Sequence, residues 1–116
     1  LGDGVHVGGL SGIHQFVRIG EGAFIGALSM VNKDVIPFGM VYGERARLMG
    51  LNLVGLRRKR FKSAIINDFK TAYAGLFSEK GTLKERLNDM NQENNPLIEK
   101  LVTFISENSD RSLLSP

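Results

Sequence analysis

Apolar residues in the first third of the chain recur at a spacing of six residues. When residues 1–36 are divided into consecutive hexads, the first position is always aliphatic: Leu1, Val7, Ile13, Ile19, Ile25 and Val31. The fifth position is always small or β-branched: Val5, Ser11, Val17, Ala23, Ser29 and Val35. Neither the period of an α-helix nor that of a single strand matches this spacing.

A period of six suits a parallel β-helix of triangular section, in which each hexad forms a short strand and a turn. First-position side chains would point into the prism and stack on their equivalents one coil away, at about 4.8 Å. Glycine occupies the second position in four of the six hexads, and we attribute it to the unusual backbone of the turn. The alternative is a set of glycine-rich loops between ordinary strands.

The hexads fill about two coils, whereas repeat folds usually need about three or more units. The sequence also starts inside the repeat, without an initiator methionine or an amino-terminal cap. We therefore expect it to be the carboxy-terminal part of a longer protein, truncated at the amino end, or to lean on partner chains.

Beyond the repeat, the pattern of apolar residues becomes helical. From Ser63 onward they lie three or four apart, which is typical of an amphipathic helix with Ser63 as its N-cap. Thr82 and Glu85 match the capping box of another short helix. Asn95 followed by Pro96 predicts the start of a last helix.

These patterns divide the chain into three parts. We expect hexapeptide-repeat β-helix coils over residues 1–36, a connector over 37–50, and an α-helical carboxy-terminal domain over 51–116. The predicted fold is a β-helix of about two coils closed by a small helical bundle, with residues 108–116 frayed.

Composition excludes several classes of protein. The chain has no cysteine and only two histidines, so disulfides and thiolate metal sites are absent and a zinc enzyme is a poor match. No run of eighteen apolar residues and no secretory leader is present, so we expect no membrane span and a cytoplasmic location.

Positive charge is concentrated in one segment. Seven basic residues and no acidic one lie between Arg45 and Lys62, whereas the rest of the chain carries eight basic and twelve acidic residues. Clustered Arg and Lys suit phosphate groups or an acidic partner protein. A nucleic-acid-binding protein would use the same charges, but no recognition-helix motif is present and the aromatic residues lie on apolar helix faces.

Several segments together resemble one enzyme family. "IHQFVRIGEGAFIGALS", "DVIPFG", "GLNLVGLRRKRF" and "FKTAYAGLF" resemble, in order and spacing, the carboxy-terminal half of bacterial acyl-carrier-protein:UDP-N-acetylglucosamine O-acyltransferases. The resemblance implies a left-handed β-helix and a homotrimer with active sites in the clefts between subunits. It also implies transfer of a 3-hydroxyacyl group from acyl carrier protein to the sugar 3-hydroxyl, the first committed step of lipid A synthesis.

The same resemblance indicates which chemistry the chain lacks. The acyl group arrives on the phosphopantetheine arm of acyl carrier protein, so no further cofactor or metal is expected. In the family the general base is a histidine of an H-x-x-H-D motif in an earlier coil. Since this sequence contains no such motif, we expect no catalytic residue in it and no activity of the piece alone.

Three candidate residues lie in the repeat. His14 replaces the usual second-position glycine, and by resemblance His14 and Gln15 line the cleft near the reacting groups. The plainer alternative is a corner histidine hydrogen-bonded to the backbone. Ala27 occupies the position that closes the acyl groove in the family, and its small side chain predicts a medium-to-long acyl chain unless it merely packs. We interpret His6 as a surface or interface side chain.

The remaining candidates lie in the basic segment. By resemblance Asn52, Arg58 and Lys59 contact the nucleotide sugar. Four further arginines are expected on the approach to the cleft or facing the carrier protein and its phosphate: Arg45, Arg47, Arg57 and Arg60. Val54 stands where the family commonly has an acidic residue, so one contact to the nucleoside is missing and the detailed binding mode is open.

Two other functions remain as alternatives. The chain could be a non-catalytic module that trimerises and binds substrate within a longer enzyme. A metal-dependent hexapeptide enzyme of the carbonic anhydrase kind would need three histidines across an interface, which His6 and His14 do not supply.

Overall fold

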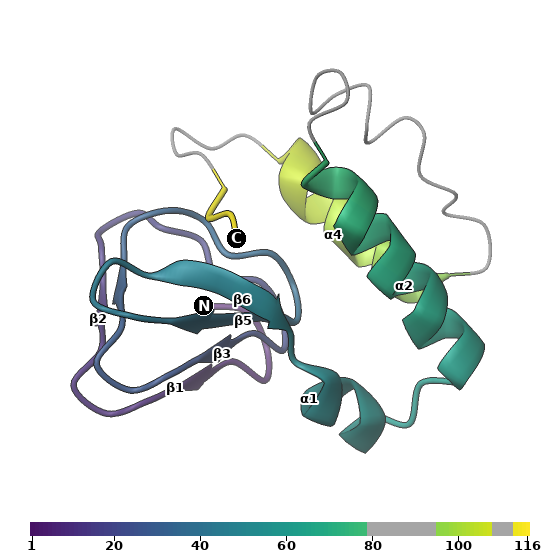
Figure 1. Cartoon of the computed structure of the whole chain (residues 1–116), viewed down its shortest axis with the longest axis horizontal. Coiled ribbons are helices and arrows are strands. Elements are labelled where there is room, and N and C mark those ends of the chain that lie inside the picture. Colours follow the sequence, from purple (N-terminus) through teal and green to yellow (C-terminus); the bar gives the residue numbers. More distant parts are fainter. Residues whose placement is uncertain (79–94, 108–112) are drawn as a thin grey trace.

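The chain folds into a three-sided coil of short strands that is followed by helices (Figure 1). The computed structural model describes residues 1–78, 95–107 and 113–116. The strands are β1 (His6–Val7), β2 (Gly12–Ile13), β3 (Phe24–Ile25), β4 (Met30–Val31), β5 (Gly39–Tyr42) and β6 (Arg47–Leu51). The helices are α1 (Leu53–Arg58), α2 (Ser63–Leu76) and α4 (Pro96–Ser106).

Successive coils pair in parallel on each side of the prism. On one side β1, β3 and β5 lie next to one another, on the second side β2 pairs with β4, and on the third Ile19 bridges to Val35. Strand β6 then turns back antiparallel to β5. The expectation of parallel, stacked hexads is therefore confirmed, and the alternative of glycine-rich loops between ordinary strands is wrong.

The six-residue register holds for the first coil and fails at the last hexad. His6 pairs with Phe24, eighteen residues on, as three hexads require. Phe24 instead pairs with Met40, sixteen residues on. The last hexad is thus shortened by two residues, and β5 continues the coil within the segment that we expected to be a connector.

The inside of the prism is filled by the two regular columns of the repeat. First-position Ile25 and Val31 and fifth-position Ala23 and Ser29 are buried. Ser29 satisfies its hydroxyl by donating to the carbonyl of Gly26 at 2.7 Å. At the amino-terminal end the column opens to solvent, where Leu1 is 81% exposed.

Our explanation of the second-position glycines is wrong. None of them has a positive φ, because the left-handed corners fall at the fourth position of the first five hexads, at Gly4, Leu10, Phe16, Gly22 and Leu28. A Cβ on Gly8 would instead lie 2.4 Å from the backbone N of Ala27. Glycine is needed because the next coil approaches closely.

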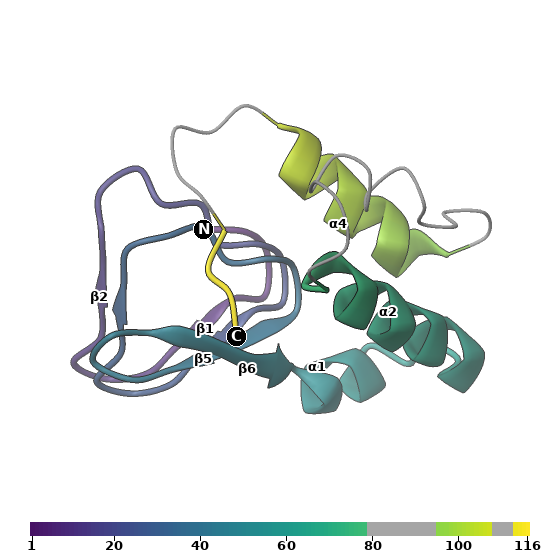
Figure 2. The ribbon, with the colours of Figure 1, turned by 45° about the horizontal axis from the view of Figure 1, so that its top comes forward.

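Helices α2 and α4 lie side by side, to one side of the coil (Figures 1 and 2). Asn95 caps α4 as predicted, since its Oδ1 accepts from the N–H groups of Leu97 and Ile98 at 3.0 and 3.2 Å. Ser63 is not an N-cap: α2 begins there, and Lys62 occupies the cap position without a side-chain hydrogen bond. The capping box at Thr82 and Glu85 lies outside the described residues.

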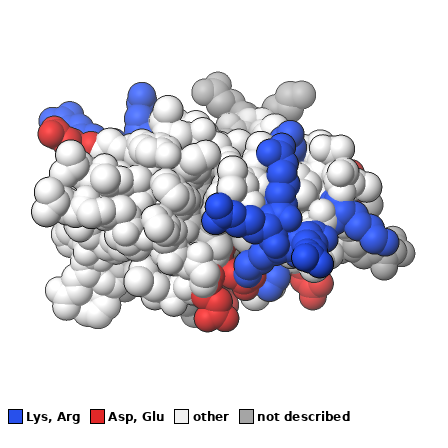
Figure 3. All heavy atoms as spheres, turned by 90° about the horizontal axis from the view of Figure 1, so that it is seen from below, with Lys and Arg blue, Asp and Glu red and all other residues white. Residues whose placement is uncertain are grey.

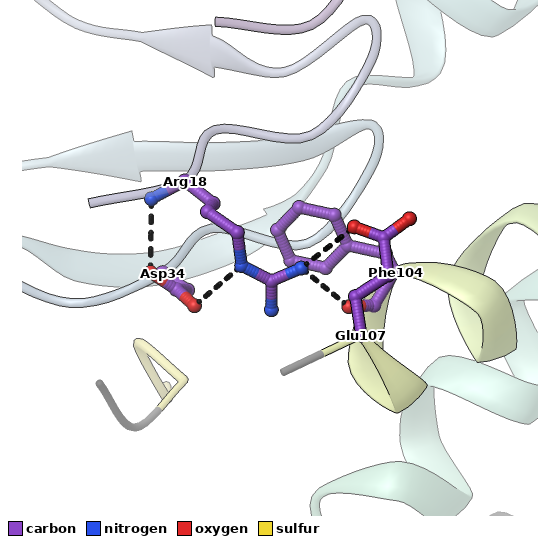
Figure 4. A network of polar contacts seen from close by, with 4 residues as sticks. All are labelled: Arg18, Asp34, Phe104 and Glu107. Carbon is purple, nitrogen blue, oxygen red and sulfur yellow. Dashed lines mark hydrogen bonds and ion pairs between the residues drawn. The ribbon is translucent and has the colours of Figure 1, made fainter. Parts of the chain in front are cut away.

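Arg18 joins the coil to α4 (Figure 4). Its Nε donates to the buried Asp34 carboxylate at 3.1 Å, and its Nη1 donates to the carbonyl of Phe104 at 2.8 Å and to Glu107 at 3.1 Å. The guanidinium also lies 4.3 Å from the centroid of the Phe104 ring. These contacts connect residues far apart in sequence and fix the end of α4 against the coil.

The carboxy-terminal residues return to the coil. Leu113 bridges to Asp34, and Leu114 is buried in the core. The prediction of a frayed end is therefore wrong for residues 113–116. No helix among residues 1–78, 95–107 and 113–116 combines the length and apolar character needed to cross a bilayer.

Candidate functional site

A first cavity, of about 800 Å³, opens beside His14. Strands β2 and β4 form part of it, together with the turn between β5 and β6, which hydrogen-bonds through Gly43 and Ala46 to Met30 of β4. The structure thus brings His14, Arg45 and Arg47 together as lining residues of one cavity. We call it the His14 cavity.

His14 differs from the glycines that share its place in the repeat. Its backbone N–H donates to the carbonyl of Val31 at 2.7 Å, so the coil pairing is kept. Its imidazole is exposed, with Nδ1 3.5 Å from the carbonyl oxygen of Gln15. This contact matches the alternative of a corner histidine hydrogen-bonded to the backbone, and a role of His14 near the reacting groups stays a prediction.

A second cavity, of about 610 Å³, lies against α1 and the β1–β3–β5 side of the coil. Asn52, Arg58 and Lys59 all line it, so these three predicted residues lie together. We call it the α1 cavity. It is separate from the His14 cavity in its lining residues.

Sequence reasoning missed the aromatic wall of the α1 cavity. The rings of His6 and Phe24 stack at 4.9 Å between centroids and 8° between planes, and Tyr42 lies 6.2 Å from Phe24. All three line the cavity. The sequence signalled the His6–Phe24 stack, because these two residues are eighteen apart, the length of the first coil; Tyr42 lies two residues beyond Met40, the register partner of Phe24, and could not be placed in this way.

The side chain of Asn52 is used by the fold itself. Its Oδ1 accepts from the N–H of Gly55 at 3.0 Å and caps α1, and its Nδ2 donates to the carbonyl of Gly22 at 2.9 Å. These bonds fix α1 against the coil and so place Arg58 and Lys59 at the cavity. A direct contact between Asn52 and a nucleotide stays a prediction.

Glu21 connects the α1 cavity to α4. It forms ion pairs with Lys59 at 3.4 Å and with Lys100 at 3.0 Å. Burial alone would raise the pKa of Glu21, but the hydrogen bond and charge of Lys100, together with those of Lys59, outweigh burial and lower it. Glu21 is therefore an anion at neutral pH that holds Lys59 in place.

The later cations of the basic segment, from Arg57 to Lys62, are exposed around the end of α1. Figure 3 shows Lys and Arg side chains gathered on one part of the face that it views. Arg57 and Arg60 are exposed but line neither cavity, and the same is true of Gln15 and Ala27. The structure therefore splits the predicted site residues between two cavities and the surface between them.

Metal ligands were also considered. Within residues 1–78, 95–107 and 113–116 no three His, Asp or Glu side chains converge in a way that could hold a metal ion.

Comparison with known proteins places this geometry in a family. A family model described as UDP-N-acetylglucosamine O-acyltransferase, domain 2, matches residues 34–114. The chain is 48% identical over 117 residues to the acyl-carrier-protein–UDP-N-acetylglucosamine O-acyltransferase of Paracoccus denitrificans, covering 100% of this chain and 44% of that protein. The corresponding protein of Rhizobium etli is 40% identical over 114 residues, covering 97% and 42%.

Solved structures agree with these matches. The UDP-N-acetylglucosamine O-acyltransferase of Moraxella catarrhalis superposes with a TM-score of 0.90 at 35% identity, covering 98% of this chain and 45% of that one. The UDP-N-acetylglucosamine acyltransferase of Campylobacter jejuni gives a TM-score of 0.85 at 37% identity, covering 99% and 45%. The chain spans less than half the length of each relative.

Proposed function

Because the chain belongs to the UDP-N-acetylglucosamine O-acyltransferase family, we propose that it is part of an enzyme that moves a 3-hydroxyacyl group from acyl carrier protein to the 3-hydroxyl of UDP-N-acetylglucosamine. This reaction would be the first step of lipid A synthesis. The observation that carries the proposal is the α1 cavity, where two cations and an aromatic wall meet beside an otherwise apolar strand face. We include in the same proposal that the coil is a left-handed β-helix and that the helices form a bundle. The proposed division of the chain is into β-helix coils over residues 1–36, a connector over 37–50 and a helical domain over 51–116.

The α1 cavity has the chemistry expected of a nucleotide site. Arg58 and Lys59 can bind phosphate oxygens by charge-assisted hydrogen bonds. The His6, Phe24 and Tyr42 rings offer a flat apolar surface to a planar or apolar group. Val54, 57% exposed at this cavity, supplies no polar contact to a ribose or base.

The His14 cavity would serve the acyl donor. His14 and Gln15 would be supporting contacts near the reacting groups, and Arg45 and Arg47 would receive a phosphate on the way in. Ala27 would leave room at the end of the acyl groove. Since residues 1–116 contain no H-x-x-H-D motif, the general base would come from another part of the enzyme.

The exposed basic surface suits an acidic carrier protein. Arg57 and Arg60 lie outside both cavities and are exposed, so they would steer docking without contacting the small substrates. We also propose a homotrimer, because several large apolar side chains of the coil, including Leu10 and Phe16, are exposed in the single chain.

One alternative is retained because the motif for the base is missing. In it, this chain is a trimerisation and substrate-binding module without catalytic groups of its own. The two proposals agree on binding and differ on turnover, so both quantities should be measured.

Binding of UDP-N-acetylglucosamine, followed by calorimetry, tests the assignment of the α1 cavity. Arg58→Ala should weaken the affinity by about tenfold to a hundredfold, the value of a charge-assisted hydrogen bond. Arg57→Ala is the matched control, because Arg57 is its neighbour on α1 and lines neither cavity. Equal losses in the two variants, or no binding by the unaltered chain, would contradict the proposal.

Turnover separates the enzyme part from the module. The chain should give no product with a 3-hydroxyacyl carrier protein and UDP-N-acetylglucosamine. A chimera in which it replaces the matching part of the Paracoccus denitrificans relative should restore turnover. Loss of turnover in a folded, trimeric chimera that still binds the nucleotide sugar would favour the module alone.

A further inference from the structure

Residues 113–116, which we call the return segment, come back to the coil beside positions far earlier in the sequence. The N–H of Leu114 donates to the carbonyl of Asp34 at 2.7 Å. The N–H of Leu48, in β6, donates to the carbonyl of Ser115 at 3.0 Å. Figures 1 and 2 show the chain end marked C beside the coil. The return segment therefore adds backbone pairing to two separate parts of the coil.

The position of this segment is strongly determined. Leu114 is 4% exposed and belongs to the hydrophobic core. The carboxylate of Asp34 is itself held by the backbone N–H and the Nε of Arg18, at 2.9 and 3.1 Å. The return segment is thus anchored by the buried side chain of Leu114 and by its hydrogen bond to the backbone carbonyl of Asp34, a residue whose own side chain is buried and paired with Arg18.

The outer side of the return segment lines the His14 cavity. The lining of this cavity includes Leu114, Ser115 and Pro116 as well as His14 and Arg47. Ser115 is exposed there, while its backbone carbonyl is bound to β6. A change of the Ser115 side chain therefore alters the wall of the cavity and leaves the backbone pairing intact.

The lining of the cavity indicates the kind of group that would pass this wall. Three cations, Lys33, Arg45 and Arg47, and one acid, Glu44, line it together with the apolar side chains of Ile13 and Met30, so the lining is net positive. This combination fits a long, flexible chain that carries one phosphate and ends in an apolar group. It fits a nucleotide poorly, because the stacked rings of this protein line the other cavity.

We propose that the return segment is a wall of the donor path, the route by which a phosphate-bearing acyl arm would enter the His14 cavity. The wall positions this arm beside His14 and limits the width of the path. The proposal rests on the proposed function, because it assumes an acyl donor. Ser115 acts here as a positioning residue, through the shape of the cavity, and takes no part in the chemistry.

Cysteine labelling tests the proposal without any need for turnover. The chain has no cysteine, so Ser115→Cys introduces a single, nearly isosteric thiol at the wall. Its alkylation by iodoacetamide is followed with and without S-octyl-phosphopantetheine, a thioether that carries no free thiol. Ser63→Cys is the matched control, because Ser63 is exposed at the start of α2 and does not line the His14 cavity.

The expected result is selective protection. S-octyl-phosphopantetheine at about ten times its Kd should slow alkylation of Ser115→Cys by about tenfold, in line with simple site occupancy. It should leave Ser63→Cys unchanged, and UDP-N-acetylglucosamine should protect neither variant. No protection at Ser115→Cys, or equal protection by the nucleotide sugar, would overturn the proposal.

A second variant measures the width of the path. Ser115→Phe should weaken binding of S-octyl-phosphopantetheine by about tenfold and leave the Kd for UDP-N-acetylglucosamine unchanged; an unchanged Kd for the donor analogue would overturn the proposal. If the unaltered chain binds UDP-N-acetylglucosamine but Ser115→Cys shows no protection by the donor analogue, the assignment of the return segment fails and the proposed function stands. If it does not bind the nucleotide sugar, the proposed function fails.

Discussion

Arg18 joins the end of α4 to the buried Asp34 of the coil, so its removal is an informative test of stability. Its Nε and backbone N–H both donate to the carboxylate of Asp34, which is fully buried. Its Nη1 donates to Phe104 and Glu107 at the end of α4 (Figure 4). Arg18→Ala would leave Asp34 buried with only the backbone N–H as a partner among these contacts.

The expected loss of stability can be assigned to individual contacts. Removing one partner of a buried ion pair costs about 3–5 kcal/mol, because the remaining charge is desolvated and uncompensated. The remaining backbone hydrogen bond keeps the loss near the lower end. The pair with Glu107 contributes no more than about 1 kcal/mol, since the Glu107 side chain is 61% exposed. We therefore expect Arg18→Ala to lower the free energy of unfolding by about 3 kcal/mol, much of the stability of a small domain.

Urea unfolding followed by the helical circular dichroism signal measures this loss. Glu107→Gln is the control, because it removes a charge from the exposed end of the same network and should cost less than about 1 kcal/mol. The double variant Arg18→Ala, Asp34→Asn should be more stable than Arg18→Ala alone, since it no longer buries an unpaired charge. If Arg18→Ala costs no more than Glu107→Gln, the reasoning is refuted.

Three further predictions concern single positions. Gly8→Ala should destabilise the coil by about 1–3 kcal/mol, because its Cβ would lie 2.4 Å from the backbone N of Ala27. Gly9→Ala should be tolerated, because a Cβ at Gly9 would have no atom within 4 Å. Thermal unfolding of the two variants measures the difference in stability. As the pH falls below about 4.5, the chain should lose the stability that Glu21 contributes, because the folded-state pKa of Glu21 is lowered from 4.5 and its protonation breaks the ion pair with Lys100. Glu21→Gln should reduce the difference in unfolding free energy between pH 6 and pH 3 by this contribution, which we expect to be less than about 1 kcal/mol; the same difference in the variant and the unaltered chain would contradict the prediction. Ala27→Met should shift the preferred donor of the chimera to a shorter acyl chain, and an unchanged preference among donors of different length would show that Ala27 only packs.

The coil could be predicted from the sequence because its defining signal is local and repeated. Each aliphatic first position and each compact fifth position adds an independent observation, and only a few folds have a period of six. The shortening of the last hexad could not be predicted, since Val31 and Val35 fit their expected positions as residue types. The pairings of Ile19 with Val35 and of Phe24 with Met40, both sixteen residues apart, reveal that the coil is two residues shorter.

The corners show a different limit of sequence reasoning. Glycine suggested the turn, but the left-handed conformation falls two positions later, where Leu10, Phe16 and Leu28 adopt it despite their side chains. Such residues cost of order 1–3 kcal/mol each unless their surroundings enforce the conformation. Here the hydrogen bonds between neighbouring coils hold these residues in the left-handed conformation. Such pairing forms only in the folded chain, so it cannot be predicted from residue type.

The candidate site was predictable only where one residue type points to one chemistry. Clustered cations predicted a phosphate or an acidic partner from residue type alone, and the resemblance narrowed the nucleotide contacts to Asn52, Arg58 and Lys59; the phosphate role of the two cations stays a prediction. Asn52 could not be assigned from its type, because an amide that caps a helix and an amide that binds a base have the same sequence signature, and the structure shows the first use. The return segment was misjudged for a related reason: Leu113 and Leu114 are a short apolar pair in a polar stretch, and the place of the segment depends on Asp34 and Leu48, which are distant in the sequence.

The two cavities together explain why one short chain carries both a rigid coil and basic helices. The coil supplies fixed backbone, so the rings of His6 and Phe24 and the imidazole of His14 stand at positions determined by coil pairing. The cations that would bind phosphates stand on α1 and on the turn before β6, whose places are fixed by Asn52 and by the pairing of β6 with β5. Rigid elements that hold charged groups in place reduce the entropy lost when a flexible substrate binds. A change in the coil should therefore alter substrate affinity even when it touches neither cavity.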